Sequence, residues 1–79
     1  MFKFLIVFEK TKTGYSAFSP DLKGRIATGS TKDETDENMF TAVQLHLKGM
    51  IADKIPIPKP KSISEYILVD SKQLSSALG

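Results

Sequence analysis

The sequence contains no cysteine among its 79 residues. This absence excludes a disulfide-stabilised scaffold, a zinc knuckle and a thiol nucleophile. No apolar run approaches the ~18 residues that span a membrane. The apolar opening Met1–Phe8 is short and aromatic and has no small-residue cleavage site, so it is not typical of a signal peptide. We therefore expect a cytoplasmic protein without membrane association.

Histidine is also scarce, since His46 is the only one. One histidine without cysteine cannot build a nitrogen–sulfur metal site, and its place at the edge of an apolar helix face favours a boundary residue over a catalytic base. Gly14, Gly24 and Gly29 are each explained by turns, so no phosphate-binding glycine loop is present. We expect no enzyme, no metal site and no cofactor.

The charge is unevenly distributed along this single small domain. The net charge is +2, with 11 basic and 9 acidic side chains. Four carboxylates fall within five residues, and outside them 11 basic side chains face only 5 acidic ones. These four are Asp33, Glu34, Asp36 and Glu37. The pattern predicts an acidic corner on a basic body, and such asymmetry steers partners more than net charge does.

Three strands are predicted before the first helix. Residues 2–10 place Phe2, Phe4, Ile6 and Phe8 on one face by the two-residue period, and Leu5 and Val7 on the other. Shorter strands are expected at 15–19 and 25–28, joined by a hairpin at 11–14 and a turn at 19–24. Short connections of this kind indicate an antiparallel meander.

A helix is expected from Thr31 to about Asp53, because Thr31 and Glu34 have the spacing of a capping box. Its apolar stripe should pack on the sheet; the stripe consists of Met39, Phe40, Val43, Leu47 and Met50. Alternating prolines at 55–60 exclude helix and favour an extended crossing.

The last predicted strand is Glu65–Asp70, which is apolar on both faces and is expected inside the sheet or beside the first strand. The fold class is therefore α+β with the order β-β-β-α-β, one helix packed on an antiparallel-rich sheet. Residues 1–70 form one domain, and 71–79 form a short polar tail with at most one or two helical turns.

Two groups of acidic residues could carry metal-dependent chemistry. Asp21, Glu65 and Asp70 lie at strand ends and could form a two-metal nuclease site, but nothing in their spacing brings them together. The acidic cluster could bind Mg²⁺, although a role in complementing the helix dipole explains it better. The lysines lack interleaved aromatics, which favours a solvated rim over a nucleic-acid platform.

Several motifs together resemble the HicB-type antitoxin family. They are Ser19-Pro20-Asp21-Leu22-Lys23-Gly24, then Ala27-Thr28-Gly29-Ser30-Thr31, then Glu34, Asn38 and Ala42, and finally Asp53-Lys54-Ile55-Pro56-Ile57-Pro58. Two positions depart from the family pattern, because Lys23 replaces a proline and Lys54 replaces a glycine after the helix. Many members also carry a C-terminal DNA-binding domain, whereas nine residues follow Asp70 here.

The resemblance implies a partial RNase-H-like unit that neutralises a HicA-type toxin, a small basic ribonuclease that cleaves mRNA, by binding it directly. Pro20, Gly24, Gly29, Thr31 and Asn38 would be structural motif positions. The expected contact residues are Asp33, Glu34 and Glu37, with Asp21 and Lys23 as further candidates, because acidic side chains can mimic phosphate.

We expect no specific DNA binding by this chain alone. A homodimer or higher oligomer is predicted, because Leu5 and Val7 give the first strand a second apolar face. The alternatives are a stand-alone oligomeric domain that binds another protein or ligand, and a metal-dependent nuclease.

Overall fold

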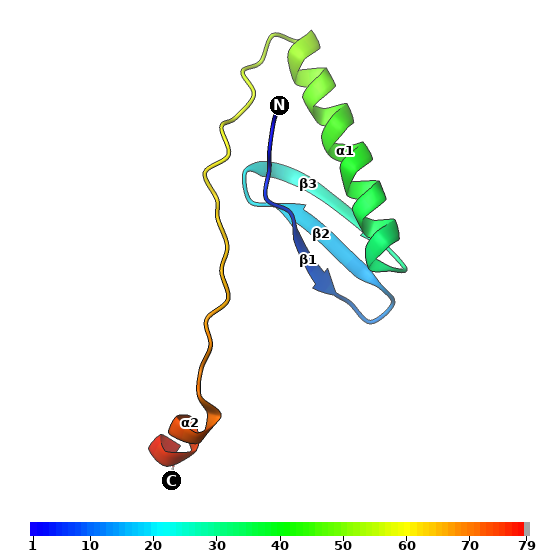
Figure 1. Cartoon of the computed structure of the whole chain (residues 1–79). Coiled ribbons are helices and arrows are strands. Elements are labelled where there is room, and N and C mark those ends of the chain that lie inside the picture. Colours follow the sequence, from blue (N-terminus) through cyan, green and yellow to red (C-terminus); the bar gives the residue numbers. More distant parts are fainter. Residues whose placement is uncertain (79) are drawn as a thin grey trace.

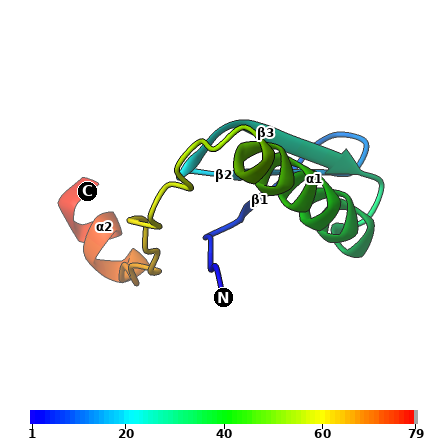
Figure 2. The same cartoon turned by 90° about the horizontal axis from the view of Figure 1, so that it is seen from above.

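The computed structural model describes residues 1–78. Its elements are three strands, β1 (Val7–Lys10), β2 (Tyr15–Ser19) and β3 (Leu22–Gly29), and two helices, α1 (Lys32–Ala52) and α2 (Ser71–Leu78). The strands form one antiparallel sheet in the order β1-β2-β3 (Figure 1). Helix α1 lies across one face of this sheet, and α2 lies far from both (Figure 2). The α+β class with one helix on an antiparallel sheet is confirmed.

Register decides which side chains lie beneath α1. Phe8, Ala17 and Ala27 stand opposite one another and share a face, and Ala17 is fully buried there. Val7 and Phe18, which are half-buried, share the other face with the exposed Ile26. The strand predicted at residues 2–10 is wrong over its first half, because only Val7–Lys10 pair with β2 and residues 1–6 belong to no strand. The predicted alternation is confirmed for Val7 and Phe8.

The core is small. Its buried apolar side chains are Ala17, Leu22 and Met39, together with the buried polar residues Ser19 and Thr35. The predicted helix stripe is wrong at Phe40, which is 64% exposed although the adjacent Met39 is buried. Phe40 lies about 100° further round the helix than Met39 and faces the N-terminal segment instead of the sheet. Val43, Leu47 and Met50 are half-buried, because the sheet lies along only the first half of the helix.

Helix α1 begins and ends as the sequence predicts. Thr31 is the N-cap, and its hydroxyl accepts a hydrogen bond from the Glu34 amide at 3.0 Å. At the other end, the Ile55 amide donates to the Met50 carbonyl at 2.8 Å and the Lys54 amide to Ile51 at 3.1 Å. This is the Schellman pattern, and Lys54 takes its left-handed position with φ 57°.

The chain after α1 departs from the prediction. Residues 55–60, here called the linker, and residues 61–70, here called the arm, are extended but belong to no strand of the described sheet. The expected strand Glu65–Asp70 is thus not paired within this chain. The tail forms the two turns of α2, and position 79 lies outside the described residues.

The arm makes the molecule elongated. Its radius of gyration is 17.2 Å, whereas a compact domain of this length has about 12 Å. Residues 1–54, here called the body, contain the sheet and α1, and the arm carries α2 away from them (Figure 1). Within the described residues, no helix is long and apolar enough to cross a membrane.

Candidate functional site

The first turn of α1 gathers the predicted acidic residues. Glu34 has a structural role there, because its carboxylate accepts hydrogen bonds from the Ser30 hydroxyl at 2.8 Å and from the Ser30 amide at 3.4 Å. Together with the Thr31 hydroxyl, it satisfies amides at the helix start. Glu34 is therefore occupied with capping the helix in the free chain.

The other three carboxylates form an acidic patch, defined as Asp33, Asp36 and Glu37. All three are exposed, and no ion pair holds them within the described part of the chain. The positive end of the helix dipole favours negative charge at this position. The patch is thus a stable, solvent-facing concentration of charge that is open to a basic partner.

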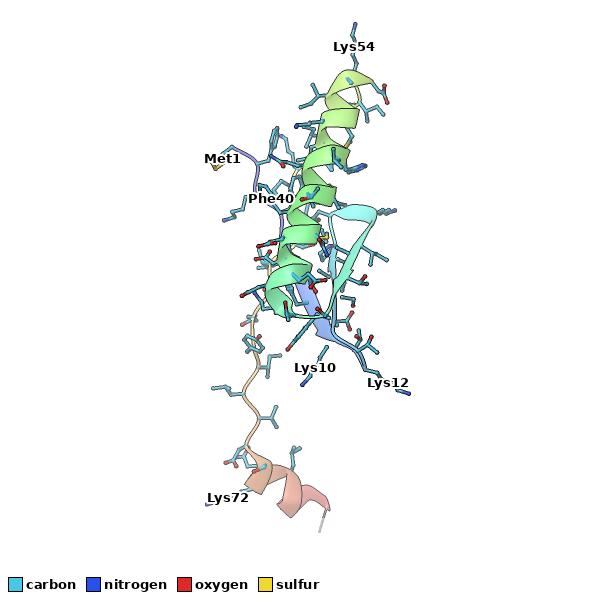
Figure 3. All side chains as sticks on the ribbon, turned by 90° about the vertical axis from the view of Figure 1, so that its right-hand side faces the viewer. Met1, Lys10, Lys12, Phe40, Lys54 and Lys72 are labelled. Carbon is cyan, nitrogen blue, oxygen red and sulfur yellow. The ribbon has the colours of Figure 1, made fainter. Side chains whose placement is uncertain are left out.

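An apolar groove adjoins the acidic patch. It has a volume of about 430 Å³ and lies between the N-terminal segment and α1. It is lined by Met1, Phe2, Phe4, Ile6, Asp36, Met39, Phe40, Val43, Gln44 and Leu47. Asp36 belongs to both features, and Phe40 lies on the side of α1 where Met1 is found (Figure 3). We call this feature the helix groove.

The β2–β3 turn positions Asp21 to hold the arm. The Asp21 carboxylate accepts hydrogen bonds from the Lys61 amide, the Ser62 amide and the Ser62 hydroxyl, each at 3.1 Å. The backbone N–H of Ser62 stabilises the carboxylate most and lowers the pKa of Asp21. Asp21 is therefore a clamp between turn and arm, whereas the neighbouring Lys23 is exposed.

The glycines of the motif meet two different needs. Gly24 adopts φ 75°, which only glycine does without strain. Gly29 permits close packing, because a Cβ there would lie 2.6 Å from Thr35 Oγ1. The Thr35 hydroxyl donates to the Thr31 carbonyl at 2.7 Å. Sequence reasoning missed Thr35, although its spacing of four from the capping threonine offered a signal.

The remaining motif residues brace the body. Asn38 Nδ2 donates to the Thr28 carbonyl at 2.8 Å, which ties α1 to the end of β3. Pro20 is exposed at the β2–β3 turn. Lys32 lies 4.5 Å from the centre of the Phe8 ring, a cation–π contact that the sequence did not reveal. Asn38 and Lys32 therefore have structural contacts within the body.

The acids of the nuclease alternative are separated in the structure. Asp21 clamps the arm, Glu65 lies within the arm, and the Asp70 carboxylate accepts a hydrogen bond from the Lys72 amide at 2.8 Å, which caps α2. Across residues 1–78, no three His, Asp or Glu side chains gather as a metal site. His46 is half-buried on α1.

Comparison with known proteins identifies the family. The family model of HicB-like antitoxins of bacterial toxin-antitoxin systems matches residues 4–74, and the chain belongs to this family. Family membership makes it a non-enzymatic regulatory protein, as the sequence predicted.

Three curated relatives are similar in sequence. A 14.9 kDa protein from the rep-hol intergenic region of Haemophilus phage HP1 is 36% identical over 78% of this chain, which spans 47% of that protein. UPF0150 proteins of Synechocystis and Helicobacter pylori are 35% and 36% identical over 75% and 71% of this chain, covering 76% and 78% of theirs. The chain therefore spans about half the length of the phage relative and about three quarters of the other two.

A solved structure matches the fold as well. One chain of a HicA3 and HicB3 toxin-antitoxin complex superposes with a TM-score of 0.61 and 26% identity, covering 91% of this chain and 86% of that one. The match extends over nearly the whole chain and therefore beyond the body, which comprises residues 1–54.

Proposed function

We propose that this protein is an antitoxin that neutralises a HicA-type toxin by binding it directly. The observation that carries the proposal is the family assignment together with the similarity to a chain of a toxin-antitoxin complex. The structure supports it, because the described residues offer an acidic patch and an apolar groove without a catalytic cluster.

The acidic patch and the helix groove would contact the toxin together. Asp33 and Glu37 supply charge opposite a basic ribonuclease surface, and the groove supplies apolar area beside it. Glu34 would act mainly by holding the helix start in place. Asp21 and Lys23 lie at the β2–β3 turn, and Asp21 would influence binding through the arm that it clamps.

The working unit in this proposal is residues 1–70, with 71–79 as its tail, acting in the cytoplasm as a homodimer or higher oligomer. The uncovered face of Val7, Phe18 and Ile26 supports self-association, because this small core leaves those side chains open. The chain alone is expected to show no specific operator binding, because its lysines form a rim suited to phosphate contacts without base readout.

A matched pair of substitutions at the two ends of α1 tests the proposed contact. We expect Glu37→Lys to slow association with a HicA-type toxin by about 3- to 10-fold at low salt, and to weaken the salt dependence of the rate. Asp53→Lys changes the net charge equally at the far end of the helix, and should leave the rate within about twofold. Stopped-flow association and rescue of growth from the toxin are the measurements.

The outcomes separate the surface from the function. If both variants bind as fast as the wild type, the acidic patch is not part of the interface. If the wild-type chain neither binds the toxin nor restores growth, the antitoxin proposal fails, and the alternative of a stand-alone domain with another protein or ligand takes its place. Circular dichroism verifies that each variant is folded.

A further inference from the structure

One edge of the sheet, formed by β1 and residues 1–6, has no strand partner among the described residues. Strand β1 lies at the edge, and residues 1–6 extend it without a backbone hydrogen bond to any described residue. An unpaired edge presents a row of N–H and C=O groups on which another strand can form.

The arm is a second extended segment without a strand partner in the described part of the chain. Residues 63–69 make no hydrogen bond with any described residue, and their side chains are exposed on both faces: Ile63 by 93%, Tyr66 by 97% and Leu68 by 95%. Ordering an extended segment costs about 1–2 kcal/mol per residue, which solvent contact alone does not offset. A segment of this composition therefore requires a strand partner.

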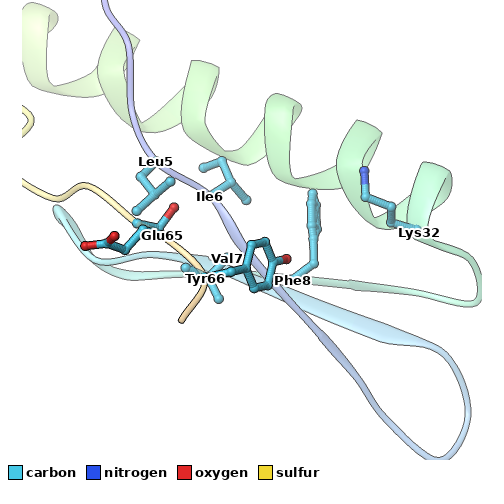
Figure 4. Close-up of a pocket in the computed structure, with 8 residues that line it drawn as sticks. Leu5, Ile6, Val7, Phe8, Lys32, Glu65 and Tyr66 are labelled. Atoms are coloured by element: carbon cyan, nitrogen blue, oxygen red, sulfur yellow. The ribbon is translucent and has the colours of Figure 1, made fainter. Parts of the chain in front are cut away.

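The path of the arm keeps it from closing fully on its own sheet. The Asp21 clamp fixes Lys61 and Ser62, after which residues 64–66 face Leu5–Phe8 across a cleft of about 460 Å³ without hydrogen bonds (Figure 4). The arm then continues past the end of the sheet to α2 (Figure 1). The proline-rich linker is stiff and maintains this direction.

The exposed area indicates a second copy as the missing partner. The chain exposes 6843 Å², whereas a compact protein of this mass exposes about 4,700 Å². The excess of about 2,100 Å² per chain lies within the roughly 1,000–2,500 Å² that each subunit buries in an obligate homodimer. One self-association could therefore account for the whole excess.

We propose that two copies exchange their arms, so that residues 63–69 of each copy pair with the β1 edge of the other. The arm and β1 of one chain run in the same direction (Figure 1), so a two-fold axis perpendicular to the sheet makes the partner's arm antiparallel to β1. The partner's arm would enter the cleft beside Leu5 and Val7 and cover their apolar side chains. This inference concerns the chain alone and does not depend on toxin binding.

Proline substitutions that block each half of the exchange test this proposal. Ile67→Pro removes a backbone N–H from the arm and prevents it from pairing as a strand. The double variant Leu5→Pro, Ile6→Pro does the same at the sheet edge, at positions that make no backbone hydrogen bond within the single chain. We expect each to be monomeric by light scattering and a mixture of the two to recover dimers, because one intact arm then meets one intact edge. Ser71→Pro, at the first position of α2, is the control and should remain dimeric.

Each other outcome overturns the exchange. Wild-type monomers at tens of micromolar would show that the arm pairs within its own chain or stays free. Dimers of the edge variant would show that arms pair with each other. Failure of the mixture to recover dimers would equally exclude pairing between arm and edge.

Hydrogen exchange on the wild type gives the same answer if a proline variant fails to fold. In the exchanged dimer, amides of 63–69 and of 2–6 should both exchange at least about tenfold more slowly at high than at low protein concentration. Protection of 63–69 alone would exclude the exchange, as would protection that is independent of concentration.

Discussion

The body and the arm are built on opposite principles. In the body, short-range polar contacts fix each junction: Thr31 caps α1, Asn38 bonds to β3 and Gly29 allows Thr35 to approach. In the arm, the Asp21 clamp fixes residues 61 and 62, and residues 63–69 make no hydrogen bond with any described residue. The body is thus specified by its own sequence, whereas the arm has the form of half of an interface.

Truncating one apolar side chain in the body and one in the arm should give the largest difference in the free energy of unfolding between the two regions. Met39 is 1% exposed, and we expect Met39→Ala to lower the free energy of unfolding by about 2–5 kcal/mol. Leu68 is 95% exposed, and Leu68→Ala should change it by less than about 0.5 kcal/mol at concentrations where the chain is monomeric. Urea denaturation measures both, and a large loss in the monomeric Leu68 variant would contradict the division.

A pair of glycines sharpens the comparison within the body. A Cβ at Gly29 would lie 2.6 Å from Thr35 Oγ1, so Gly29→Ala should destabilise the fold by about 1–3 kcal/mol. A Cβ at Gly49 meets nothing within 4 Å, so Gly49→Ala should stabilise α1 by about 0.4–1 kcal/mol. Thermal unfolding followed by circular dichroism distinguishes the two, and equal effects would refute the close approach of α1 to β3.

The smallest expected effect is the loss of the hydrogen bonds between Asp21 and the arm at low pH. Hydrogen bonding to the carboxylate lowers the pKa of Asp21, with the Ser62 amide as the main cause. The clamp is therefore fully present above the unfolded value of about 3.9 and is lost as the pH falls through the lower folded value. The Ser62 amide proton should follow this titration by NMR, and Asp21→Asn should abolish it. A midpoint at or above the ordinary value would contradict the clamp.

Sequence reasoning succeeded where structure is decided locally. The capping box at Thr31, the alternation of Val7 and Phe8, and the end of the helix before the prolines all depend on residues within a few positions of each other. The family resemblance, and not a local pattern, singled out Lys54, which stands where the family usually has glycine and adopts φ 57°.

Sequence reasoning failed where distant segments decide. The bonds from Lys61 and Ser62 to Asp21 span about 40 positions, and no local pattern announces them. Periodicity placed Phe40 on the core face but could not show that this side of α1 faces the N-terminal segment and not the sheet. The two apolar faces of residues 65–70 predicted a strand, whereas the structure leaves this segment extended and outside the sheet.

The candidate site was predicted in part. Asp33 and Glu37 are exposed as a contact surface requires, but Glu34 is engaged by Ser30, which composition alone cannot show. The helix groove was missed because it forms between the N-terminal segment and α1, which are far apart in the sequence. The partial RNase-H-like assignment, which places a fourth strand in the sheet, stays a prediction.

Lys54 sets how freely the arm can swing. A side chain at φ 57° costs about 1–2 kcal/mol that glycine would avoid. Glycine, however, would open many more backbone conformations at the junction between α1 and the linker. With lysine followed by a proline-rich linker, the joint has few alternative angles, so it behaves as a stiff bracket rather than a hinge. Lys54 therefore restricts the orientations of the arm relative to the body. Its backbone strain lowers the stability of the single chain, but the restricted arm presents residues 63–69 to a partner in a more definite geometry.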